Sequence, residues 1–390
     1  MEPVESKRKA LKGDSSLKVG AVQRITILKK MILYVFITIG ACIIILFAGL
    51  WIVSPGKPKP FLDKEGNILK GSISEKSFIE INGHKMGMFI RGRDSTKPVV
   101  LMMHGGPGMP EYSISRNYPL VLEDIFTVCW WDIRGAGLSF NPDIPVETLT
   151  FDQFVEDAIA MANYLRHRFN REKIYLMAHS GGTMAGILTA QRAPELFRAY
   201  LAISQISNQM ESEKLAYKYM IDEFTKAGDK RMLRRFKKYP VDHLNTPSYY
   251  VMRDLPMHKL GIGTTHKMRS VVTGVFIPVM LSRELTLKEK INVWRGKALI
   301  TKTAGLWDKL VRTDLTQKVT EFKIPVYFFS GAYDYTVSSK LAEDYFEKIK
   351  APVKKFYLFE HSAHSPLFEE PEKMRSILEK EVVARNETTK

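Results

Sequence analysis

Short apolar runs alternate with amphipathic helical patterns over residues 75–385. KPVVLMMHGGPG (97–108), FTVCWWDIRGAGLS (126–139) and KIYLMAHS (173–180) are largely apolar and end in glycine or polar residues. The stretch 150–169 between two of them has the 3.6-residue periodicity of a helix. Strands that are apolar throughout are typical of parallel sheets covered by helices on both faces. The sequence therefore predicts an α/β fold with a mostly parallel sheet. An Asn-Gly dipeptide between two strand-like runs in 77–92 also predicts a hairpin.

The alternation of strands and helices is interrupted between residues 206 and 318. This segment is helical in pattern and holds 22 Lys/Arg against 11 Asp/Glu. We interpret it as a helical cap inserted into a core formed by 75–205 and 319–390. No nucleic-acid-reading module accompanies the charge, so no nucleic-acid partner is expected. The basic run RMLRRFKK (231–238) fits either an anionic surface or a solvated helix face.

The N-terminal region has the pattern of a membrane anchor. Residues 31–53 contain no charged side chain, and 23 helical residues span about 34 Å, enough for a hydrocarbon core of about 30 Å. Residues 1–30 carry eight Lys/Arg and three Asp/Glu. A cleaved secretory signal and a buried core helix are the alternatives. An uncleaved, single-pass helix in the cell membrane is preferred, with 1–30 in the cytoplasm, 54–74 as a linker, and the remainder outside. Only two cysteines, Cys42 and Cys129, are present, so no disulfide framework is expected.

A serine follows the apolar run that ends near residue 179. The sequence AHSGG resembles G-x-S-x-G, in which a sharp strand-to-helix turn lifts a serine hydroxyl into a crevice. Small residues two before and two after Ser180, here Ala178 and Gly182, leave room for that turn. The N–H of Gly181 would lie at a helix N-terminus, suited to binding an oxyanion. A turn in which the serine only caps a helix is the alternative.

Three further segments carry residues that complete this chemistry. The glycines of HGGPG (104–108) let a backbone donor, here the N–H of Gly106, point at an oxyanion. Asp334 comes after a strand-like run, where ligands bind in such sheets. The run HSAHSPLFEEP holds His361 and His364, of which His364 is the preferred base and His361 is assigned a structural role. The chain order serine, aspartate, histidine is that of the α/β-hydrolases.

The chain resembles the α/β-hydrolases, and among them the proline iminopeptidases. The motifs that carry this resemblance are HGGPG (104–108), WWDIRGAGLS (130–139), AHSGGT (178–183), SGAYD (330–334) and SAHSPLFEEP (362–371). The resemblance implies Ser180 as nucleophile, Asp334 as acid and His364 as base, with Gly106 and Gly181 as the oxyanion hole. Iminopeptidases usually carry Gly-Gly-Ser-Trp-Gly at the elbow, whereas this chain has His179 before the serine and Gly181 after it.

The expected reaction is acyl transfer through an acyl-Ser180 intermediate. Peptides or amides with a free N-terminus are the preferred substrates, because cap glutamates hold the substrate amine in iminopeptidases and Glu211 and Glu213 open the cap here. Solvated acids in the first turn of a helix are the alternative for this pair. A carboxylesterase or lipase-like activity, and a catalytically silent receptor or scaffold, are the other functions considered. No metal or organic cofactor is expected.

Overall fold

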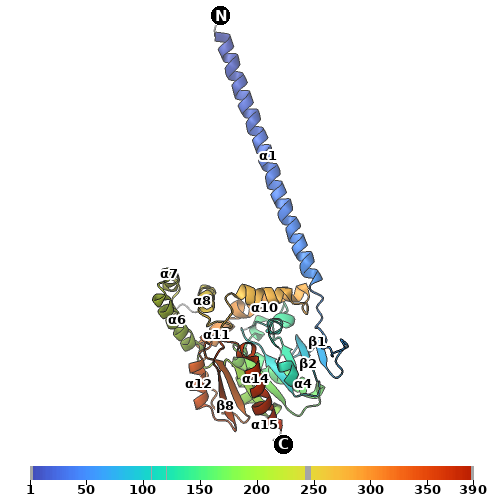
Figure 1. Ribbon diagram of the computed structural model, residues 1–390. Helices are drawn as coiled ribbons and strands as arrows, with labels where there is room; N and C mark the ends of the chain where they lie inside the picture. The colour runs from blue at the N-terminus through green and yellow to red at the C-terminus, as the bar shows by residue number, and fades with distance from the viewer. Residues whose placement is uncertain (1–2, 107, 120, 242–246, 388–390) are drawn as a thin grey trace. The chain divides into compact units, whose positions relative to one another are not determined.

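One long helix forms the N-terminal part of the chain. The computed structural model describes residues 3–106, 108–119, 121–241 and 247–387. It divides into two units, Met1–Val53 and Ser54–Lys390 (Figure 1). In the first unit, helix α1 covers Pro3–Ile52. Its stretch Leu28–Ile52 is long and apolar enough to cross a membrane, and it includes nearly all of the predicted span.

The second unit contains an eight-stranded sheet. Its spatial order is β1-β2-β4-β3-β5-β6-β7-β8. β1 pairs antiparallel with β2, β2 pairs antiparallel with β4, and the remaining neighbours are parallel, which confirms the predicted mostly parallel sheet. The strands are β1 (Ile73–Ile81), β2 (His84–Gly92), β3 (Val99–Met103), β4 (Thr127–Trp131), β5 (Ile174–His179), β6 (Phe197–Ile203), β7 (Val326–Gly331) and β8 (Lys354–Phe359).

The first two strands form the predicted hairpin. Asn82 and Gly83 connect them with φ angles of 48° and 70°. Two successive residues with positive φ match the right-handed twist of the flanking strands, and Asn-Gly is the dipeptide that adopts them most readily.

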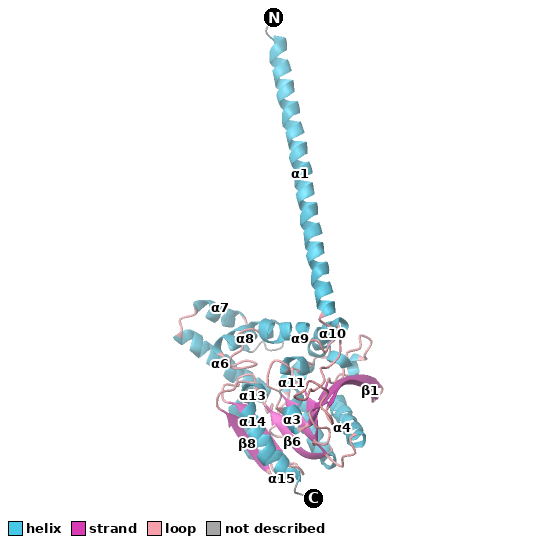
Figure 2. Ribbon diagram, turned by 45° about the vertical axis from the view of Figure 1, so that its right-hand side comes forward, coloured by secondary structure: helices cyan, strands magenta, loops and turns pink. Residues whose placement is uncertain are grey.

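Helices cover both faces of the sheet (Figure 2). Along β5, Ile174, Leu176 and Ala178 pack into one hydrophobic cluster, and Tyr175 and Met177 pack into the other. The first cluster includes α4 (Phe151–Arg168), α5 (Gly182–Arg192) and α12 (Ser339–Lys348), and the second includes α2 (Tyr112–Ser115), α3 (Leu122–Ile125) and α14 (Pro371–Ile377). These five side chains of β5 are fully buried, which is why residues 174–178 form a continuous apolar run in the sequence.

Between β6 and β7 the described helices are joined by turns and irregular segments, and no described strand lies among them. Helices α6, α7, α8 and α10 lie at one end of the second unit, and α14 and α15 (Ala384–Glu387) lie toward the other (Figure 1). The boundaries 206–318 stay a prediction. The segments are α6 (Gln209–Lys226), α7 (Lys230–Lys238), α8 (Pro247–Leu260), the π-helical turn Val272–Phe276, α9 (Ile277–Leu281), α10 (Leu287–Ala298), the π-helical turn Leu299–Thr303 and α11 (Leu306–Arg312).

The start of the second unit is hydrogen-bonded to this helical region. Ser54 Oγ accepts a hydrogen bond from Lys290 Nζ at 2.7 Å, and Gly56 N donates to the carbonyl of Arg283 at 3.0 Å. Lys59 N donates to Glu284 Oε1 at 3.3 Å. The first residues of the predicted linker are therefore packed on the segment 283–290.

Candidate active site

Ser180 lies in a strained turn between β5 and α5. Its φ is +52°, a left-handed conformation that is uncommon for a residue other than glycine. A side chain at Gly182 would place its Cβ 2.5 Å from the carbonyl oxygen of His104, so only glycine fits there. Ala178 takes the position where the usual motif has glycine, and its Cβ packs where Gly186 has no side chain. The fold therefore holds Ser180 in the predicted elbow geometry, because backbone and small side chains surround the turn.

Asp334 and His364 meet Ser180 at the carboxyl ends of the strands. Asp334 follows β7, and His364 follows β8. His364 Nδ1 is 2.9 Å from Asp334 Oδ2, and His364 Nε2 is 2.7 Å from Ser180 Oγ. The other carboxylate oxygen of Asp334 accepts from Val337 N at 2.9 Å. Because a carboxylate accepts the Nδ1 hydrogen, Nε2 is left to take the serine proton.

The second histidine of the same segment is placed differently. The side chain of His361 is exposed, and its backbone N–H donates to Glu370 Oε2 at 2.9 Å. His364 is buried, with 6% of its surface exposed. The structure therefore brings His364, and not His361, to the serine.

Gly106 and Gly181 both line the cavity beside Ser180. Gly106 has a φ of 112°, which only glycine adopts without strain, and Gly181 directly precedes helix α5. Among the described residues, no acceptor pairs with the amide of either glycine. Free backbone donors at a helix N-terminus and in a glycine loop are suited to an oxyanion.

A buried pair that the sequence analysis did not identify lies under the serine. Glu111 Oε1 is 2.7 Å from His179 Nδ1 and accepts from Gly105 N at 3.0 Å. His179 Nε2 faces the carbonyl oxygen of His364 at 2.8 Å. A Cβ built on Gly105 would lie 2.7 Å from Ser180 Cβ and 3.3 Å from Glu111 Oε1, so these two atoms are at most 6 Å apart.

Each member of the Glu111–His179 pair favours the charged form of the other. Burial opposes both charges, but the partner and the surrounding hydrogen bonds outweigh it. As a result, the pKa of His179 is raised and the pKa of Glu111 is lowered. The other carboxylate oxygen of Glu111 is buried without a hydrogen-bond partner in the described part of the chain. The sequence offered one signal for this pair, namely a histidine directly before the serine of the elbow. A buried imidazole that faces an acceptor with each ring nitrogen donates from both, and the resulting charge needs an acid close by.

These residues form the polar floor of a cavity with a volume of about 570 Å³. Its roof comes from the helical region and includes Met257, Val272, Phe276, Trp294 and Trp307. The helical region is also hydrogen-bonded to the candidate catalytic histidine. His364 N donates to the carbonyl of Gly263 at 3.3 Å. The cavity therefore combines a polar floor at Ser180 with a roof in which apolar side chains lie beside the charged residues Arg253, Asp254 and Lys297.

Neither cap glutamate that was expected to bind a substrate amine lines this cavity. Glu211 is half exposed in the first turn of α6 and pairs with Lys214 at 2.8 Å. Glu213 is fully buried and accepts hydrogen bonds from Gln209 and Arg253. Residues two apart on a helix point in directions that differ by about 200°, so the side chains of Glu211 and Glu213 have different surroundings. The acids that do line the cavity are Glu111 and Asp254.

Comparisons with known proteins agree with this architecture. The sequence model of the α/β-hydrolase fold matches residues 98–371. The chain is 32% identical over 309 residues to a probable aminopeptidase, YbaC, of Bacillus subtilis, covering 77% of this chain and 94% of that one. It is 26% identical over 322 residues to a proline iminopeptidase of Thermoplasma volcanium, covering 79% and 97%. The crystal structure of a proline iminopeptidase from Mycobacterium smegmatis superposes with a TM-score of 0.54 at 16% identity, covering 81% and 100%.

Proposed function

The chain belongs to the α/β-hydrolase family and resembles its proline iminopeptidases, and we propose that it is a membrane-anchored serine hydrolase that acts on amides or peptides with a free N-terminus. The observation that carries the proposal is the hydrogen-bonded series from Ser180 Oγ through His364 to Asp334. A scaffold without activity has no need to hold a serine in a strained conformation against a buried histidine and aspartate.

The first half of the reaction forms an acyl-enzyme. Ser180 Oγ attacks the substrate carbonyl carbon while His364 Nε2 takes the hydroxyl proton, and Asp334 stabilises the imidazolium through Nδ1. The carbonyl oxygen becomes an oxyanion, which the amides of Gly106 and Gly181 bind. His364 then gives its proton to the leaving amine, and the C–N bond breaks.

The second half of the reaction releases the acid. Water attacks the acyl-Ser180 carbonyl, His364 Nε2 accepts the water proton, and the same two amides bind the second oxyanion. Ser180 leaves as the hydroxyl when His364 returns the proton. Every proton transfer in this scheme uses one atom, Nε2 of His364, which lies 2.7 Å from Ser180 Oγ.

The substrate class is supported by the relatives and by the acids that line the cavity. Two relatives are named as a probable aminopeptidase and a proline iminopeptidase. Glu111 and Asp254 are the acids that line the cavity, beside the cations of Arg253 and Lys297, and Glu111 Oε2 has no hydrogen-bond partner among the described residues. A carboxylate bonded to a substrate ammonium is a charge-assisted interaction. We assign the amine-binding role to these acids in place of Glu211 and Glu213.

Ester hydrolysis is the second candidate, because part of the roof of the cavity is apolar. Val272, Phe276 and Trp294 offer surface for an acyl chain and no charge for an ammonium. The full-length protein in detergent is assayed with aminoacyl-arylamides and with p-nitrophenyl esters, beside its Ser180→Ala variant. Arylamide turnover that needs Ser180 supports the proposal. Turnover of esters without turnover of arylamides would make the protein an esterase. If neither substrate is hydrolysed and the fluorophosphonate probe does not label the protein, the proposal that it is a serine hydrolase is refuted.

Anchoring in a membrane is supported by α1. Leu28–Ile52 has the length and composition of a spanning helix, and the residues before it are strongly basic. A basic segment before the span favours a cytoplasmic N-terminus and a catalytic unit on the other side.

A further inference from the structure

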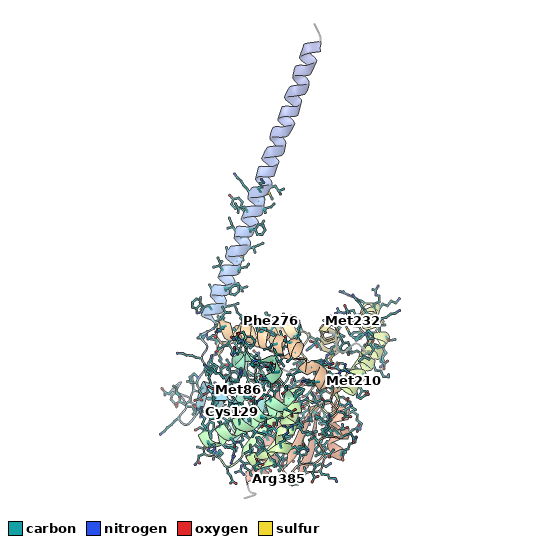
Figure 3. The ribbon with its side chains drawn as sticks, turned by 180° about the vertical axis from the view of Figure 1, so that it is seen from behind. Met86, Cys129, Met210, Met232, Phe276 and Arg385 are labelled. Atoms are coloured by element: carbon teal, nitrogen blue, oxygen red, sulfur yellow. The ribbon has the colours of Figure 1, made fainter. Side chains whose placement is uncertain are left out.

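An apolar surface adjoins the cavity. Val271, Val272, Phe276, Ile277 and Leu281 expose between 37% and 57% of their surfaces. No charged residue occurs between 270 and 282. Phe276 lies at the opposite end of the second unit from Arg385 (Figure 3). We call the segment 271–281 the apolar ridge.

The apolar ridge lacks the polar outer face of an ordinary surface helix. Its inner side is already used, since Val279 is fully buried and Val275 lines the cavity. A helix on the surface of a protein in water normally presents polar residues outward. A contiguous apolar patch on the outside marks a surface that is covered by a partner.

We propose that the apolar ridge docks on the surface of the lipid bilayer that holds α1, an inference that rests on the membrane anchoring proposed above. Chain connectivity selects this partner. Helix α1 ends at Ile52, and Gly56 is hydrogen-bonded to Arg283, two residues after the ridge. The four residues from Ile52 to Gly56 span at most about 14 Å, and the hydrogen bond to Arg283 and the two residues back to Leu281 add about 10 Å, so the chain keeps the end of the ridge within about 24 Å of the end of the membrane span.

The charges around the apolar ridge fit an anionic lipid surface. Lys267 and Arg269 precede it, Arg283 and Lys288 follow it, and all four are exposed. Basic residues near an anionic membrane surface each contribute about 1 kcal/mol to binding. Apolar residues flanked by basic ones are the composition of segments that lie in the membrane interface.

Docking at this place determines how a substrate reaches Ser180. Val271, Val272 and Phe276 belong to the apolar ridge and also line the cavity. A substrate with a lipid-soluble tail would therefore pass from the bilayer along the ridge to the active site. The substrate class that this geometry favours is amphiphilic amides, with the free amine in the polar cavity and an apolar chain toward the lipid.

Fluorescence quenching by lipid tests the docking directly. The full chain, with Cys42→Ser to remove the exposed thiol, is placed one copy per nanodisc of phosphatidylcholine and phosphatidylglycerol. Bimane is attached in separate variants at Leu281→Cys on the ridge, Arg385→Cys in α15, and Phe47→Cys in α1. Brominated lipids are expected to quench positions 281 and 47 by more than about twofold, because an interfacial helix lies about 5–10 Å into the lipid boundary. Position 385 should be unchanged, because it lies at the end of the second unit opposite Phe276 (Figure 3).

Each pattern of quenching has a defined meaning. Quenching at 47 without quenching at 281 overturns the docking and leaves the anchoring intact. No quenching at 47 refutes both. A third pattern assigns the ridge to a second copy of the chain. In that pattern, lipid does not quench position 281, and the position is shielded from a water-soluble quencher only when two copies share a disc. None of these readouts needs activity, so the Ser180→Ala form serves equally well and failure of the enzymatic proposal does not affect the result.

Kinetics test the access route. Ile277→Glu with Leu281→Glu changes ridge residues that do not line the cavity, and Leu215→Glu with Leu358→Glu changes two similarly exposed residues elsewhere. Substrates with the same aminoacyl group are supplied on a soluble arylamine and on a long-chain amine in the nanodisc. The ridge variant is expected to lose about tenfold in turnover of the bilayer substrate relative to the soluble one, or about 1.4 kcal/mol. Equal ratios in the ridge and control variants would overturn the access route.

Discussion

Glu111 Oε1 lies 2.7 Å from Nδ1 of His179, the residue that immediately precedes Ser180. Because His179 Nε2 faces the carbonyl of His364, the pair connects the serine turn to the backbone of the general base. Both side chains are buried, with Glu111 8% exposed and His179 6% exposed. The pair is therefore a positioning element for two members of the proposed triad.

Glu111→Gln is expected to lower both stability and kcat. Removing one partner of a buried ion pair costs about 3–5 kcal/mol, and the loss of alignment is expected to lower kcat by about tenfold or more. The pKa of His179, followed by NMR, should fall because its anionic partner is gone.

Glu123→Gln is the matched control, since Glu123 forms a buried pair with Arg91 at 2.9 Å that does not line the cavity. It should lose stability while keeping kcat, and an equal loss of kcat in both variants would reduce the Glu111 pair to a structural role.

Ser180→Ala is expected to abolish hydrolysis and labelling by a fluorophosphonate probe. Removing the nucleophile of a triad lowers kcat by at least about a thousandfold. The fold should persist, because Ser180 N still donates to the carbonyl of Ile203 in the variant. Circular dichroism checks the fold, and probe labelling checks the nucleophile. Persistent labelling would mean that another residue reacts.

Glu211→Gln and Glu213→Gln should differ sharply in stability. Glu213 is fully buried against Arg253, so its replacement removes the nearer carboxylate from a buried guanidinium and costs about 3–5 kcal/mol. Glu211 is exposed on the surface of α6, where such changes stay within about 0.5 kcal/mol. Chemical denaturation measures both. Equal arylamide and ester losses in the Glu213 variant would fit a structural role, whereas a loss confined to arylamides would restore its amine-binding assignment.

Asp132 gives stability a predictable pH dependence. Burial raises the pKa of this carboxyl to about 8, against the opposing hydrogen bond from Leu138 N. In the unfolded chain the pKa returns to its ordinary value of 3.8. The folded state thus holds a proton that the unfolded state releases, and this contribution to stability is lost as pH rises through about 8. Asp132→Asn should flatten the change in Tm between about pH 5 and about pH 8, and an unchanged slope would contradict the assignment.

The orientation of the chain can be tested on intact cells. A protease added outside is expected to remove the catalytic unit and to leave residues 1–30 protected, because basic segments stay in the cytoplasm. Immunoblots against tags at each end report the two parts. Cleavage of the catalytic unit only after permeabilisation would reverse the orientation.

The features that the sequence predicted well are local ones. The Asn82-Gly83 turn, the buried run of β5 and the turn at Ser180 follow from a few adjacent residues. Asp334 and His364 could also be placed, because each follows a strand whose carboxyl end lies at the same edge of the sheet.

The features that it missed depend on contacts between distant residues. Glu111 and His179 are 68 positions apart, and Glu213 and Arg253 are 40 apart. Helical periodicity alone does not say whether Glu211 or Glu213 faces the core, since that depends on how α6 packs. The contact between Lys59 and Glu284 joins residues 225 positions apart, and no pattern within the linker indicates it.

The hydrogen bond from His364 N to the carbonyl of Gly263 connects the roof of the cavity to the backbone of the general base. A roof that lifts to admit a substrate must lengthen this bond, and one that settles again must restore it. The backbone position of the general base is thus coupled to the position of the roof. A displacement of the segment around Gly263 can therefore reach the imidazole beside Ser180 through this one hydrogen bond, without any contact with the serine itself.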